Sequence, residues 1–157
     1  MDILEEISYG PLNFIDPVEV MRAAEIHENA PVNWKPDFVL FDARVQACVL
    51  SLKKCAGDAS VFIATARSPK NEIIGFHWLC LVEKYGEKCG HIHSLWTSTK
   101  YCNHGIGGEL KRQGEAWAKS QGAKFIATEV FYANKKMIEY NLKRGFVARQ
   151  VEMLKDL

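Results

Sequence analysis

Residues 90–131 combine a strand pattern, a glycine-containing turn, a long amphipathic helix and a second strand pattern, and this succession restricts the fold more than any other feature. Gly90–Thr97 alternates in character, and a polar loop follows it. Gly105–Gln121 repeats apolar side chains at helical spacing, and Phe125–Phe131 is typical of a strand. A strand, a helix and a strand in this order predict a parallel pair joined by a right-handed crossover.

The rest of the chain predicts a mixed α/β domain. Asp16-Pro17-Val18-Glu19 offers a capping residue, a proline at the first helical position and a glutamate three residues after the cap, so we expect a helix from there to about Asn29. The further elements expected are a helix over 42–56, an antiparallel hairpin of 61–66 with 72–82, a turn at 85–88, a helix over 134–143 and a last strand from 145 to about 153. We predict the α/β class: a mostly antiparallel central sheet with one parallel strand-helix-strand crossover and helices on both faces.

Length and composition favour one soluble domain over residues 1–157. A chain of 157 residues with 48% hydrophobic and 25% charged side chains can bury a sizeable core without disulfides or metals. Its five cysteines are an odd number without a CxxC pair, which indicates reduced thiols. No apolar run approaches the length of a membrane span. The start, Met1–Glu6, is acidic and unlike a signal peptide, so we expect a cytoplasmic protein.

Charge is unevenly distributed along the chain. Residues 1–40 hold 2 basic and 8 acidic side chains, a net charge of −6, whereas residues 41–157 hold 18 basic and 11 acidic ones, a net charge of +7. A basic C-terminal part suits an anionic ligand. Its lysines and arginines are dispersed among acids without interleaved aromatics, so phosphate on a small molecule is favoured over nucleic acid.

The loop before the long helix, Cys102–Gly108, is typical of a phosphate site. Its glycines allow a ligand to approach the backbone, and the first amides of the helix are free to bind an anion. A Walker loop is excluded because no Lys-Ser or Lys-Thr pair follows the glycines. A dinucleotide fingerprint is excluded because Leu110 occupies its third glycine position.

Two segments together resemble the GNAT superfamily of acyl-CoA-dependent N-acyltransferases. The turn of that family reads Gln/Arg-x-x-Gly-x-Gly/Ala and is matched by Cys102–Gly107. Its later signature, roughly Asn-x-x-Ala-x-x-Leu-Tyr-x-Lys-x-Gly-Phe, is matched by Asn134–Phe146. The resemblance covers about residues 60–150. It implies that residues 59–157 form the sheet and the acyl-CoA-binding part, and that residues 1–58 shape the acceptor side.

The resemblance also implies how acetyl-CoA, the co-substrate, would be held. The backbone of Leu95–Thr97 would bind the pantetheine arm like an added strand, which requires an open sheet edge. The amides of Asn103–Gly108 would hold the pyrophosphate, and Lys143 could meet the phosphates. The residues implied in cofactor binding are Leu95, Trp96, Thr97, Cys102, Asn103, His104, Gly105, Ile106, Gly107, Gly108, Asn134, Asn141 and Lys143.

Two residues depart from the family pattern. Cys102 stands where the family has glutamine or arginine, so a polar contact is missing unless Lys100 or His104 replaces it. Asn141 stands where many members have the tyrosine that protonates the departing thiolate. Tyr140 is adjacent, but one residue is about 100° of helical rotation, so we expect it to point elsewhere unless the helix is distorted. Tyr132 or a water could then supply the proton.

Amine acetylation also needs a base that takes a proton from an ammonium group. His91 and His93 share one face of their strand, and His91 falls where some family members carry a glutamate base. Glu129 on the neighbouring strand is a second candidate, so the catalytic candidates are His91, Glu129 and Tyr140. Cys89 lies on the same face as the histidine pair, but structural zinc sites show tighter repeated spacing, and we expect no metal.

The function implied is transfer of an acetyl group from acetyl-CoA to a primary amine by direct attack. The alternative is a module of the same fold that binds acyl-CoA without catalysis and acts as a sensor. The expected acceptor is a small-molecule or peptide amine, with no nucleic acid or membrane partner, and the resemblance allows a homodimer. Carboxylates near the N-terminus would favour a cationic acceptor; the first to test are Glu25, Glu28 and Asp37.

Overall fold

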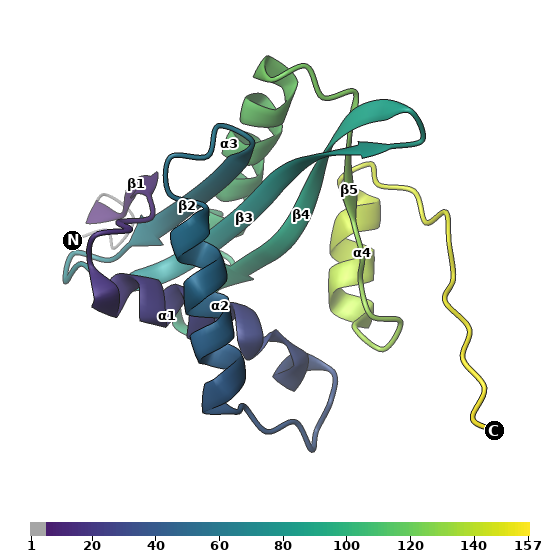
Figure 1. Ribbon diagram of the computed structural model, residues 1–157, viewed down its shortest axis with the longest axis horizontal. Helices are drawn as coiled ribbons and strands as arrows, with labels where there is room; N and C mark the ends of the chain where they lie inside the picture. The colour runs from purple at the N-terminus through teal and green to yellow at the C-terminus, as the bar shows by residue number, and fades with distance from the viewer. Residues whose placement is uncertain (1–5) are drawn as a thin grey trace.

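A computed structural model describes residues 6–157 and shows five strands with helices on both faces of the sheet (Figure 1). The strand order is β1-β2-β3-β4-β5, with antiparallel pairs up to β4 and a parallel pair of β4 with β5. The predicted fold class is therefore confirmed. The strands are β1 (Ser8–Pro11), β2 (Val61–Arg67), β3 (Ile73–Lys84), β4 (Glu87–Thr97) and β5 (Phe125–Thr128). The helices are α1 (Pro17–Glu28), α2 (Asp42–Lys54), α3 (Ile106–Ser120) and α4 (Lys135–Lys143), with short 3₁₀ helices η2 (Ala30–Asn33) and η3 (Thr99–Tyr101).

Local sequence signals set the ends of several elements. The Asp16 side chain accepts a hydrogen bond of 2.9 Å from the Val18 amide and caps α1, as predicted. Tyr85 and Gly86 join β3 to β4, and both have positive φ values, 56° and 76°. A two-residue turn of this kind matches the twist of the strands that it connects.

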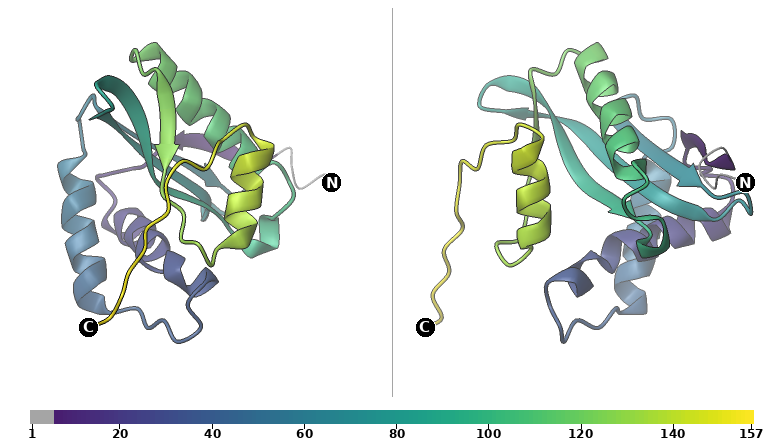
Figure 2. Two further views of the ribbon diagram at one scale, coloured as in Figure 1. Left: turned by 90° about the vertical axis from the view of Figure 1, so that its right-hand side faces the viewer. Right: turned by 180° about the vertical axis from the view of Figure 1, so that it is seen from behind.

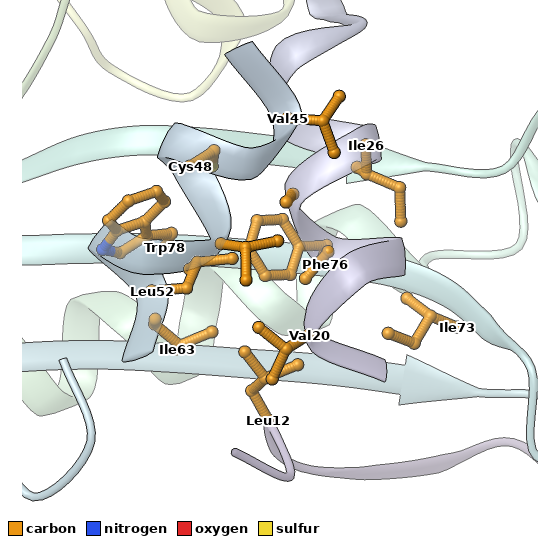
Figure 3. Packing of buried hydrophobic residues seen from close by; sticks show 13 residues of the cluster. Leu12, Val20, Ile26, Val45, Cys48, Leu52, Ile63, Ile73, Phe76 and Trp78 are labelled. Carbon is orange, nitrogen blue, oxygen red and sulfur yellow. The ribbon is translucent and has the colours of Figure 1, made fainter. Parts of the chain in front are cut away.

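The hydrophobic core lies on both faces of the sheet. The larger cluster fills the space between the sheet and the helices α1 and α2, with Phe76 and Leu52 fully buried near its centre (Figure 3). A smaller cluster lies under α3 and includes Ile106 and Leu110. At Gly75 a Cβ atom would lie only 2.7 Å from Ile106 Cγ2, so the absence of a side chain allows α3 to pack directly on β3.

The C-terminal segment differs from the prediction. Residues 146–157 have no regular secondary structure, and the predicted strand over 145–153 is wrong. A strand needs a neighbour, but β5 pairs with β4 alone in the described sheet and the segment runs away from it (Figures 1 and 2). Its apolar side chains, among them Val151 and Met153, are exposed. The preceding strand is also shorter than predicted, because β5 ends at Thr128 rather than at Phe131.

Three further expectations concern a membrane span, the acidic start of the chain and the state of the cysteines. No helix in the described part of the chain is long and apolar enough to cross a membrane. The acidic start lies, except for Glu6, outside the described residues. All five cysteines are free thiols, with Cys48 and Cys89 buried and Cys102 exposed.

A buried histidine on β3 predicts acid sensitivity. His77 is fully buried, and its Nδ1 donates a 2.8 Å hydrogen bond to the Ser94 carbonyl. Burial is the main cause that lowers the His77 pKa to about 4. The unfolded chain therefore binds a proton before the folded chain does as the pH falls from 6.5 to 4. We expect protonation of His77 to lower the free energy of unfolding by about 3 kcal/mol between pH 6.5 and pH 4.

The measurement is urea unfolding of the wild type and of His77→Gln at pH 7 and pH 4.5. The glutamine amide can still donate to the Ser94 carbonyl but does not titrate, so the variant should lose less stability on acidification. His104→Gln, at an exposed position, is the control and should behave like the wild type. Equal acid losses in all three proteins would contradict the assignment to His77.

Candidate active site

The strands β4 and β5 separate and leave part of β4 without a partner. They pair only from Cys89–Ile92 to Phe125–Thr128, and Figure 1 shows them diverging beyond these residues. The register on the other side of β4 shifts at the same point, because Leu79 pairs with Ile92 whereas Trp78 pairs with Ser94. His93 is thus the extra residue of a β-bulge. The edge of Leu95–Thr97 that faces away from β3 is open, as strand-like binding of a ligand requires.

The start of α3 lies beside this open edge. Asn103 and Gly105 have φ values of 65° and 77°, and the N-cap Gly105 provides no side-chain hydrogen bond to the helix. A helix without such a cap leaves its first amides available to an anion. A Cβ atom at Gly107 would lie 3.2 Å from Thr97 Oγ1 and 3.8 Å from Tyr140 Oη. The end of β4, the start of α3 and α4 therefore border the space that a side chain at Gly107 would occupy.

Cys102, His104 and Lys100 lie in the loop before α3, at or near the position of the family's glutamine or arginine. The Cys102 thiol is exposed and contacts the Ser98 carbonyl at 3.5 Å. His104 bends back, with Nδ1 2.9 Å from the Cys102 carbonyl oxygen, and Lys100 is exposed. Local hydrogen bonds of Cys102 and His104 therefore hold the loop.

Tyr140 faces the space at Gly107, contrary to the expectation that it would point elsewhere. Its hydroxyl is buried and has no hydrogen-bond partner among the residues described. Burial raises the pKa of Tyr140, and the nearby Arg144 opposes this shift. The Arg144 guanidinium lies 4.7 Å from the centre of the Tyr140 ring and against the first turn of α3 at Gly108. A buried phenol hydroxyl without a hydrogen-bond partner is free to donate to a group that binds beside it.

Asn141 points the other way and joins α4 to α3. Its Oδ1 accepts a 2.7 Å hydrogen bond from Lys111 Nζ, and both side chains are buried. The Lys111 ammonium also lies 4.1 Å from the centre of the Phe146 ring. Burial lowers the Lys111 pKa to about 8. Asn141 thus has a structural partner in this chain rather than a free amide beside the α3 turn.

Two other predicted cofactor residues have different surroundings from those expected. The Asn134 side chain accepts a hydrogen bond of 3.3 Å from the Met137 amide and caps α4. Lys143 is exposed, and Arg144 is the basic residue that lies over the α3 turn. Arg144 follows Tyr140 by four residues, which places both on one face of α4. That spacing is the signal by which sequence reasoning could have found Arg144.

The predicted base candidates meet where β4 and β5 separate. His91 and His93 lie with ring centres 5.0 Å apart, and His93 is 5.1 Å from Trp78. Burial, followed by the charges of His91 and His27, lowers the pKa of His93, while Glu129 opposes the shift. His93 is therefore neutral at pH 7 and able to accept a proton. The sequence-based choice of His91 from this pair rested on its alignment with the glutamate base of some family members, and the bulge places His93 beside it.

The carboxylates proposed for the acceptor side have mixed surroundings. Glu25 forms a 3.5 Å pair with Arg22, and Glu28 a 2.9 Å pair with Arg44. Asp37 is exposed in the loop before α2. The groove between α1, the β2–β3 turn and the loop before α3 has a volume of about 1340 Å³. Its lining includes Glu6, Asp16, Glu19, Glu25 and Glu72 together with Arg22, Lys70, Lys100 and Trp96.

Comparison with known families agrees with this arrangement. Residues 25–146 match the model of the acetyltransferase (GNAT) family. The chain belongs to the GNAT acetyltransferase family. The resemblance noted from the sequence is therefore confirmed, and the GNAT match runs from the end of α1 through α2, strands β2 to β5 and α3 to α4.

Solved structures show the same fold at low identity, and no curated protein matches the chain. An aminoglycoside acetyltransferase from an uncultured soil metagenomic sample is 16% identical, with a TM-score of 0.73 over 99% of each chain. Glucosamine-6-phosphate N-acetyltransferase from Arabidopsis thaliana is 14% identical, with a TM-score of 0.65 over 96% of this chain and 97% of its own. A transcriptional regulator from Bacillus halodurans is 14% identical, with a TM-score of 0.75 over 96% and 99%. At these identities the comparison shows the GNAT fold alone.

Proposed function

We propose that the protein transfers an acetyl group from acetyl-CoA to a primary amine by direct attack. The observation that carries the proposal is the space in which the open edge of Leu95–Thr97, the uncapped start of α3 and the Tyr140 hydroxyl meet. Free strand amides suit the amide groups of a pantetheine arm, and free helix amides suit its pyrophosphate. Arg144 adds a positive charge at the same helix turn.

In the proposed reaction, His93 and Tyr140 carry out different proton transfers. His93, with His91 and Glu129 beside it, would take a proton from the ammonium form of the acceptor. The free amine would then attack the thioester carbon, whose oxygen would be polarised by backbone amides near the bulge. As the carbon–sulfur bond breaks, the Tyr140 hydroxyl would give its proton to the thiolate, and the second proton lost by the attacking nitrogen would pass through water to restore the Tyr140 hydroxyl. The products are an N-acetylated amine and CoA.

The charge of the groove beside α1 supports a cationic acceptor. Five carboxylates line it against three basic side chains, Arg22, Lys70 and Lys100, and Trp96 offers an apolar surface among them. The named substrates of two structural neighbours, an aminoglycoside and glucosamine 6-phosphate, are amino sugars. We therefore place small polar amines and basic peptides first among the acceptors, in a cytoplasmic protein that can form a homodimer, has no nucleic-acid partner and transfers the acetyl group without a metal.

Calorimetric titration with acetyl-CoA, followed by a screen of amines for thiol release, tests the proposal. Micromolar acetyl-CoA binding and release of CoA with at least one amine are expected. Acetyl-CoA binding without turnover across a broad amine panel would favour the alternative, a sensor of the same fold. That alternative draws support from the similarity to a protein described as a transcriptional regulator. Absence of binding would contradict both functions.

A further inference from the structure

Three potential metal ligands converge between α1 and α2. His27 and Glu28 end α1, and Cys48 lies in the middle of α2, on the side buried against the core (Figure 3). One ligand atom from each residue lies within 4.8 Å of the other two. The two helices thus bring together a nitrogen, an oxygen and a sulfur donor from positions 20 residues apart in the sequence.

The histidine of this group has an unsatisfied atom. His27 Nδ1 is buried and has no hydrogen-bond partner within the described chain. A buried polar atom without a partner is unfavourable, and a bound ion is one way to satisfy it.

The other two donors have complementary properties. The Cys48 side chain is buried where α2 packs on the core. Glu28 is only 14% exposed, and its Oε2 accepts a 2.9 Å hydrogen bond from Arg44. Its second oxygen remains available, and Arg44 would fix the orientation of a metal-binding carboxylate from outside.

We propose that His27 Nδ1, the Glu28 carboxylate and Cys48 Sγ form a zinc site that joins α1 to α2. Imidazole, carboxylate and thiolate are the ligands of zinc, whereas calcium and magnesium prefer oxygen alone. A water would complete the tetrahedron, and the thiol proton would pass to solvent when the zinc–sulfur bond forms. Zinc bonds of about 2.0–2.3 Å place ligand atoms about 3.5 Å apart, so the side chains would move together by about 1 Å.

The test is titration of the purified full-length protein with zinc in competition with a chromophoric chelator. We expect one zinc per chain and a higher melting temperature with zinc than with a chelator. Cobalt should give the near-ultraviolet sulfur-to-metal band of a bound thiolate. Cys48→Ser should remove that band, and His27→Gln should weaken zinc binding at least tenfold.

Matched variants separate this site from other thiols and imidazoles. Cys55→Ser removes the next thiol of the same helix region, and His93→Gln breaks the histidine pair of β4; both should bind zinc like the wild type. The proposal would be overturned if the wild type bound no zinc. It would also be overturned if Cys48→Ser still bound zinc and the cobalt complex of the wild type showed no thiolate band. Loss of binding in His93→Gln alone would place the zinc elsewhere and would also overturn it. Should His27→Gln fail to fold, the cobalt spectra of the wild type and of Cys48→Ser decide alone.

Discussion

Replacement of Gly107 with tryptophan should abolish acetyl-CoA binding while the protein stays folded. A Cβ atom at this position already lies 3.2 Å from Thr97 Oγ1 and 3.8 Å from Tyr140 Oη. An indole must therefore extend into the space between the end of β4 and the start of α3. Because the proposed pyrophosphate and pantetheine contacts share that space, we expect affinity to fall by at least about 100-fold, or about 2.7 kcal/mol.

Calorimetry on Gly107→Trp and on Lys119→Trp measures this effect. Lys119 is exposed near the opposite end of α3, so the second variant adds the same side chain away from the proposed site. It should bind acetyl-CoA like the wild type. Circular dichroism and melting temperature confirm folding in both. Undiminished binding by a folded Gly107→Trp protein would show that the cofactor does not use this turn.

Alanine substitutions of the proposed base are expected to slow acetyl transfer without weakening acetyl-CoA binding. Loss of a general base typically costs about 10²- to 10⁴-fold in rate. His93 has a lowered pKa and lies at the bulge, so we expect His93→Ala to show the largest loss, with smaller losses in His91→Ala and Glu129→Ala. Glu87→Ala, an exposed change at the far end of β4, is the control and should keep full activity.

The pH profile identifies the titrating group. Because the His93 pKa is lowered from 6.5, its neutral form persists into mildly acidic solution. In the wild type kcat/KM should be constant near pH 7 and fall as the pH drops through a value below 6.5. His93→Ala should lose this decline together with most of the rate. Unaltered turnover in all three alanine variants would remove these residues from the proposed mechanism.

Elements controlled by neighbouring residues were predictable from the sequence. The start of α1 follows from Asp16-Pro17, and the turn between β3 and β4 follows from Tyr85-Gly86, because each signal acts within a few residues. The parallel pair of β4 and β5 was also predictable, since a crossover helix restricts topology strongly. The last strand was not, because the pattern of residues 145–153 indicates strand propensity but cannot say whether a neighbouring edge is in reach.

The candidate site was also predictable only in part. The glycine turn and the open edge of β4 were predicted from motifs, and the separation of β4 from β5 is consistent with both. The orientation of Tyr140 could not be predicted, because it depends on the hydrogen bond between Asn141 and Lys111, which sets the rotation of α4 against α3. The nearness of His27, Glu28 and Cys48 likewise arises from packing of α1 on α2, for which local sequence carries no signal.

Beyond α4 the last part of the chain has no helix or strand, and its Arg149 guanidinium lies 5.5 Å from the centre of the Tyr85 ring at the β3–β4 turn. Beyond Phe146 the backbone pairs with no strand, and the side chains of Val147, Val151 and Leu154 are exposed. A chain end of this kind tolerates insertion and is open to proteases. Trypsin should cut at Arg149 before it cuts within the sheet. The C-terminus is accordingly the end to which a fusion partner or an affinity tag can be joined with least disturbance of the domain.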